Sequence, residues 1–68
     1  MEQELGRKEG MAIDYENLGL LCAERDDLDK AASYWTKSLV LAREMGALPL
    51  IQKVESNFTD HGLDIPTT

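Results

Sequence analysis

Small residues placed around one tryptophan at helical spacing constrain the fold of this chain more than any other feature. Gly19, Ala31 and Ser38 have small side chains or none, and Trp35 lies between the last two in the sequence. A glycine inside a helical pattern costs about 1 kcal/mol relative to alanine and usually has a packing reason. We therefore predict two helices that approach closely at the small residues, with Trp35 filling the space beside them.

The wider pattern resembles the tetratricopeptide repeat, a helix–turn–helix unit written W-x2-L-G-x2-Y…A-x3-F…P. Leu18, Gly19 and Ala31 match this motif, while Tyr15 and Trp35 take its Trp and Phe positions. Other residues replace the usual ones at the remaining positions, namely Cys22, Asp26, Ser38 and Arg43. The resemblance implies a protein-binding unit without chemistry of its own. An unrelated helical hairpin is the alternative.

A second observation is a repeat within the chain itself. Glu4-Leu5-Gly6 is echoed by Glu44-Met45-Gly46, 40 residues later, and self-similarity at a fixed period is typical of repeat architectures. This period resembles the longer-linker variant of the family, in which a charged segment such as residues 6–10 joins two repeats. Only one complete repeat fits, and repeat proteins usually need at least three units. We therefore expect self-association, membership of a longer array, or unusually good capping.

These patterns predict an all-α fold, with an antiparallel helical hairpin and a third, capping helix in one unit. The predicted segments are a lead-in over 1–7, a first helix over 8–24, a second helix over 27–45, a capping helix over 48–62 and a tail over 63–68. The inner face of the first helix, by its i, i+4, i+7 spacing, is predicted to be Met11, Tyr15, Leu18 and Cys22. The inner face of the second helix is predicted to be Leu28, Ala31, Trp35, Ser38, Leu39 and Ala42.

Capping residues mark the helix ends. Asp27 can accept hydrogen bonds from the free amides of the second helix as its N-cap, and Gly46 can end that helix in a left-handed conformation. Pro49 suits the first turn of the third helix. Gly62 can end it, with Leu63 folding back on the cap.

The charge balance limits the classes of partner. The chain has 68 residues and a net charge of −6, which disfavours nucleic acid and anionic membrane surfaces. Its single cysteine excludes an intramolecular disulfide and fits a reducing compartment. No apolar run approaches the roughly 18 residues of a membrane span, and the N-terminus lacks the pattern of a signal peptide. We expect a cytoplasmic protein.

Residues that could carry chemistry are few and isolated. Cys22 is expected to be a small buried residue, and His61 lacks partners at metal-ligand or catalytic spacing. The acidic run that includes Asp27 fails as a calcium loop, because its sixth and twelfth positions would be Ala32 and Ser38. We therefore predict no catalytic activity, no cofactor and no metal site.

The family resemblance also implies a binding groove. In that family the first helix of each repeat lines a concave groove and contacts ligands through its outward positions. Those positions here are Ile13, Glu16, Asn17, Leu20 and Glu24. The implied mechanism is burial of a peptide or helix of a partner, with Ile13 and Leu20 as apolar anchors. Glu16 and Leu20 stand where a carboxylate-clamping variant would need Lys or Asn, so that ligand is not expected.

A second apolar set lies off the inner face of the second helix, at Tyr34, Val40 and Leu41. Exposed, these residues would form a patch of the kind that marks interfaces, and we would expect a homo-oligomer. Covered, they would contact the third helix. The rivals to a partner-binding module are a purely structural assembly unit and a small helical DNA-binding domain. The scattered Lys and Arg residues disfavour the DNA-binding domain.

Overall fold

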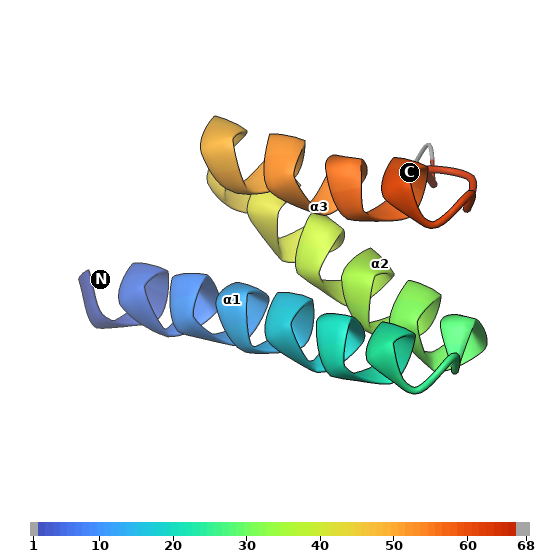
Figure 1. Ribbon diagram of the computed structural model, residues 1–68. Coiled ribbons are helices and arrows are strands. Elements are labelled where there is room, and N and C mark those ends of the chain that lie inside the picture. Colours follow the sequence, from blue (N-terminus) through green and yellow to red (C-terminus); the bar gives the residue numbers. More distant parts are fainter. Residues whose placement is uncertain (1, 67–68) are drawn as a thin grey trace.

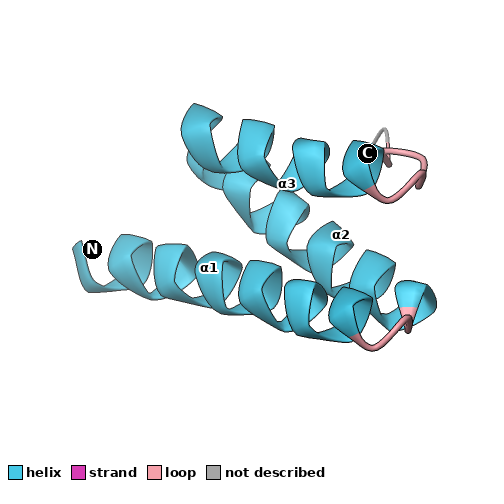
Figure 2. Ribbon diagram, in the orientation of Figure 1, coloured by secondary structure: helices cyan, strands magenta, loops and turns pink. Residues whose placement is uncertain are grey.

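The computed structural model describes residues 2–66, with side chains from residue 6 onward. Three helices follow one another: α1 (Glu2–Glu24), α2 (Leu28–Met45) and α3 (Leu48–Asp60). α1 and α2 form an antiparallel hairpin. α2 runs diagonally between the other two helices and packs against both, whereas α1 and α3 make few contacts with each other (Figure 1). The predicted all-α fold is confirmed, and short turns join the helices (Figure 2).

The hairpin closes over small residues, as predicted. Ala12 of α1 and Ala31 and Ser38 of α2 are fully buried, and Ser38 Oγ donates a hydrogen bond to Ala12 O at 2.7 Å. Trp35 is also fully buried, and its Nε1 donates to Glu16 O at 3.1 Å. These two bonds tie side chains of α2 to the backbone of α1, which sets the register of the hairpin.

α3 packs on a second face of α2. Val54 and Phe58 of α3 are buried against Trp35 and Leu39 of α2. The Trp35 and Phe58 rings meet edge to face, with centroids 5.7 Å apart and planes at 67°, an arrangement that adds about 0.5–1.5 kcal/mol beyond the buried area. Trp35 therefore links all three helices.

Each helix ends with one residue in the left-handed conformation: Asp26 (φ 61°), Gly46 (φ 65°) and Gly62 (φ 69°). The amide after each of them bonds the carbonyl five residues earlier, at 2.9, 3.0 and 2.8 Å in turn, which closes a Schellman motif. Asp27 Oδ1 accepts from Lys30 N at 3.3 Å. The predicted N-cap at Asp27 and the predicted stops at Gly46 and Gly62 are confirmed.

One predicted boundary is wrong. α1 begins at Glu2 rather than at residue 8, because Gly6 and Gly10 weaken a helix without breaking its hydrogen bonding. Lys8 also pairs with Glu44 of α2 at 3.7 Å. At the other end, residues 63–66 are not helical, and Arg43 Nη2 donates to Pro66 O at 3.0 Å, which holds Pro66 beside α2. Met1 and residues 67–68 lie outside the described residues.

Candidate interaction surfaces

One side of the α1–α2 hairpin, away from the surface that α3 covers, is apolar and accessible. We call it the hairpin face and define it as Met11, Tyr15, Leu18, Tyr34, Lys37, Val40 and Leu41. Met11, Leu18 and Val40 are 41%, 40% and 41% exposed, which is unusual for large apolar side chains gathered on one side of a helix pair. Such contiguous apolar patches mark interaction sites more often than single exposed residues do.

The hairpin face exists because α1 is turned relative to the prediction. The predicted inner face included Met11 and Leu18, which are exposed, whereas Ala12 and Glu16 are buried; Gly19 is buried as predicted. Neighbouring residues on an α-helix are about 100° apart, so the covered stripe of α1 is shifted by part of that angle. The cause is Trp35, whose indole needs the space that only a glycine leaves. The larger apolar residues, one position earlier, therefore face outward.

Two stacked tyrosines and one lysine form the centre of the hairpin face. The Tyr15 and Tyr34 rings are 6.2 Å apart with planes at 25°. Lys37 Nζ lies 5.7 Å from the Tyr15 centroid and 5.9 Å from the Tyr34 centroid, within reach of cation–π attraction. Lys37 is thus held over the apolar patch with its charge accessible to a partner. Lys37 belongs to no sequence motif and was therefore not among the predicted site residues.

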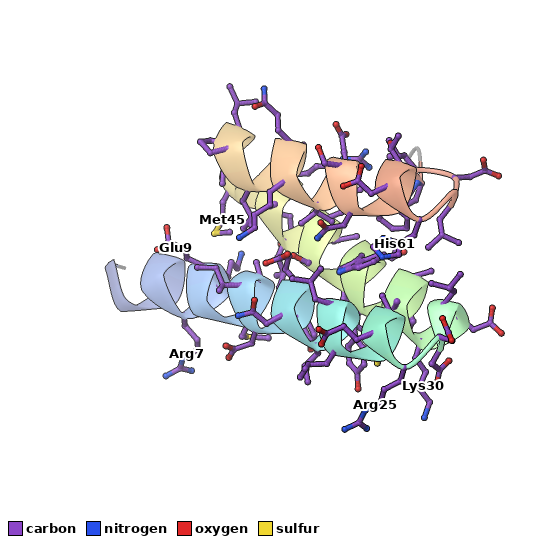
Figure 3. The ribbon with its side chains drawn as sticks, in the orientation of Figure 1. Arg7, Glu9, Arg25, Lys30, Met45 and His61 are labelled. Carbon is purple, nitrogen blue, oxygen red and sulfur yellow. The ribbon has the colours of Figure 1, made fainter. Side chains whose placement is uncertain are left out.

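Two shallow hollows, of about 300 and 310 Å³, lie along this surface. The larger one is lined by Arg7, Lys8, Met11 and Leu41. The other is lined by Met11, Tyr15, Thr36, Lys37, Val40 and Leu41. Because Met11 and Leu41 line both, the two hollows adjoin each other along α1 and α2, and together we call them the depression of the hairpin face. The side chain of Arg7 points away from α2 and α3 at the N-terminal end of α1 (Figure 3).

The three residues predicted as a self-association patch all lie on the hairpin face. Val40 is exposed, and Tyr34 and Leu41 are half-buried. None of them packs against the core that α2 shares with α3. The alternative expectation, contact with the third helix, is therefore wrong. Whether they bind a copy of the chain stays a prediction.

The predicted groove residues are only partly brought together. Ile13 is 42% exposed, and Asn17 and Glu24 are also exposed. Leu20 is half-buried and packs against the core between the helices, so it is at most a partial anchor. Leu21, which no motif singled out, is 53% exposed one turn from Asn17. This groove side carries apolar groups, but its residues line neither of the two hollows of the hairpin face.

Glu16 does not face outward, and its predicted place in the groove is wrong. Its side chain is 1% exposed, because α3 covers it. Asn57 Nδ2 donates to Glu16 Oε2 at 2.8 Å, and Lys53 Nζ lies 3.5 Å from Glu16 Oε1. The carboxylate therefore fastens α3 to α1. A buried charge of this kind persists only when its partners satisfy it.

The remaining polar side chains serve the fold. His61 caps α3, where Nδ1 lies 2.9 Å from Asn57 O, and its ring points toward the hairpin (Figure 3), 5.2 Å from the Trp35 ring. Cys22 is half-buried and unpaired. Among the side chains described, those of residues 6–66, His, Cys, Asp and Glu form no group of three that could hold a metal ion. No helix in this part of the chain is both long enough and apolar enough to cross a membrane.

Comparison with known proteins adds no relative to this picture. No protein-family model, no curated protein and no solved structure matches the chain.

Proposed function

We propose that the chain is a non-catalytic protein-interaction module of the tetratricopeptide kind, which binds a helix or other segment of a partner protein. The observation that carries this proposal is the hairpin face, where Met11, Leu18 and Val40 are each about 40% exposed and where Met11 and Val40 line its adjoining hollows. Covering such a patch stabilises a complex by roughly 25 cal/mol for each Å² of apolar area. The acidic balance and the single cysteine support a protein partner in a reducing, cytoplasmic setting.

The architecture supports the repeat assignment in two ways. The Gly19 and Trp35 contact uses the spacing that carries the family resemblance. α3 lies beside the hairpin as the first helix of a following repeat would (Figure 1). The hairpin face then corresponds to a surface that a preceding unit would cover. In this interpretation the chain presents one end of a helical stack to its partner.

The groove side is the second surface through which the same function could operate. Ile13 and Leu21 are its exposed apolar residues, and Asn17 and Glu24 are the polar residues that would orient a peptide. We favour the hairpin face over the groove side because its depression can receive a ridge of side chains from a partner.

A structural assembly unit is the second candidate function, and the apolar hairpin face favours it as well. A second copy could cover the patch, and two-fold symmetry would bring the same residues of both copies together. Sedimentation over a wide concentration range separates the two functions. A mass that stays that of a monomer at millimolar concentration refutes the assembly unit and leaves the surface open for a partner.

Photo-crosslinking in cells tests the proposed function directly. A photoreactive phenylalanine analogue replaces Met11 on the hairpin face, Ile13 on the groove side, or Gln52, an exposed polar residue of α3. We expect Met11 or Ile13 to capture a defined partner that Gln52 does not. If the two apolar positions capture nothing beyond what Gln52 captures, the chain is not an interaction module.

A further inference from the structure

The length of the depression on the hairpin face and the charged side chains at its rim fit one class of occupant. We propose that it receives an amphipathic helix of a partner protein whose apolar ridge is flanked by carboxylates. This inference rests on the proposed function and deepens it. It selects the hairpin face over the groove side and names the chemistry of the partner.

The length of the depression fits a helix. Its lining runs along α1 from Arg7 to Tyr15, which spans about 12 Å at 1.5 Å per residue. That distance is slightly more than two helical turns, so two or three ridge residues at i, i+3/i+4 and i+7 can insert. Met11 and Leu41 lie at the middle of the depression and would contact the central ridge residue. The flanking walls are side chains of two helices, so the surface offers no strand edge for an extended peptide.

The charge of the rim fits an acidic partner. Lys37 lies over Tyr15 and Tyr34 at one end, and Arg7 and Lys8 line the other end. Glu44 pairs with Lys8 at 3.7 Å, whereas Lys37 takes part in none of the ion pairs described among residues 6–66. Although the chain carries −6 overall, charges beyond about 8 Å are screened at physiological salt. The basic side chains at the rim, rather than the net charge of the chain, therefore determine which charges of a partner are attracted.

The same rim disfavours a second copy as the occupant. A two-fold contact through the hairpin face would use the same patch on both molecules and place the basic groups of one copy near those of the other. Like charges that face each other across an interface weaken binding. An acidic helix instead gives Lys37 a carboxylate partner while its ridge covers Met11, Val40 and Leu41.

Two synthetic helical peptides test the inference. Both carry one leucine ridge of about two turns, and the flanks are glutamate in one peptide and lysine in the other. Fluorescence anisotropy of each labelled peptide is measured against the full chain at low and at physiological salt. We expect the glutamate peptide to bind about tenfold more tightly, as a few partly exposed ion pairs allow. That preference should shrink as the salt concentration rises.

Matched variants on α2 connect the preference to the hairpin face. Lys37→Gln should remove most of the preference for the glutamate peptide, and Lys30→Gln, an exposed lysine of the same helix, should leave it intact. Val40→Asp should weaken both peptides. Trp35 emission and helical circular dichroism confirm that each variant is folded. Equal binding of the two peptides, or equal effects of the two lysine variants, overturns the inference.

Two other results would also overturn this inference, with opposite consequences for the proposed function. If crosslinking captures a partner at Ile13 but not at Met11, the chain is still an interaction module, and its binding site lies on the groove side. A concentration-dependent dimer that Val40→Asp dissociates assigns the hairpin face to a second copy and favours the assembly unit.

Discussion

Replacing Gly19 by alanine adds a single carbon atom where the indole of Trp35 lies against α1. That Cβ would be 2.8 Å from Trp35 Cε2 and closer still to Nε1 and Cδ1, so the ring would have to move. Trp35 is fully buried, and its Nε1 donates to Glu16 O at 3.1 Å. Because Nε1 itself is the atom nearest to the added Cβ, movement of the ring both compresses its neighbours and breaks this hydrogen bond.

The expected cost follows from these two effects. Overpacking a core costs about 1–3 kcal/mol, and leaving the buried indole N–H without a partner costs about 1–3 kcal/mol. The higher helix propensity of alanine relative to glycine offsets about 1 kcal/mol of this cost. We therefore expect Gly19→Ala to lower the free energy of unfolding by about 3 kcal/mol. A loss of that size is a large fraction of the stability of a small domain.

Urea denaturation followed by circular dichroism measures this change, with Trp35 emission as a second probe because the chain has one tryptophan. Gly10→Ala is the matched control, since a Cβ there meets nothing within 4 Å in the same helix. It should raise the free energy of unfolding by up to about 1 kcal/mol. If Gly19→Ala is too unstable to measure, the double variant Gly19→Ala/Trp35→Phe should regain part of the lost stability, because the smaller ring can shift away from the added Cβ with fewer neighbours to displace.

The reasoning is refuted if Gly19→Ala stabilises the protein as Gly10→Ala does. It is also refuted if Trp35→Phe makes the alanine variant less stable instead of more stable. Either result would mean that Trp35 does not determine how closely α2 approaches α1.

Three further changes have expected outcomes. Asp26→Gly should raise the free energy of unfolding by about 1 kcal/mol, because Asp26 has φ 61° and glycine takes that conformation without strain; a lower midpoint in urea would contradict this. Trp35→Ala should cost about 3–5 kcal/mol and abolish cooperative unfolding by heat. Glu16→Ala should cost about 1–3 kcal/mol by leaving its α3 partners without an acceptor. Glu24→Ala, at an exposed position, is the control and should change stability by less than about 0.5 kcal/mol. Equal effects of the two variants in urea titrations would show that Glu16 does not fasten α3.

Local signals in the sequence were sufficient for the helix caps and for the contact between Gly19 and Trp35. Asp27, Gly46 and Gly62 act on backbone groups within five residues of themselves, so their roles depend little on the rest of the molecule. Gly19 and Trp35 were predictable as a pair because a glycine inside a helix needs a close neighbour and the chain offers one large candidate. The three-helix fold followed from these elements.

The orientation of α1 and the composition of the candidate site depended on tertiary structure. The spacing of Met11 and Leu18 described an apolar stripe correctly but did not say whether α2 would cover it. Glu16 read as a surface residue, and its burial depends on Asn57, which is 41 residues away in the sequence, and on Lys53. Periodicity identifies an amphipathic face, but the volume of Trp35 and the position of α3 decide which face is covered. Those quantities arise from contacts between helices, so the hairpin face and its lysine became visible only in the folded chain.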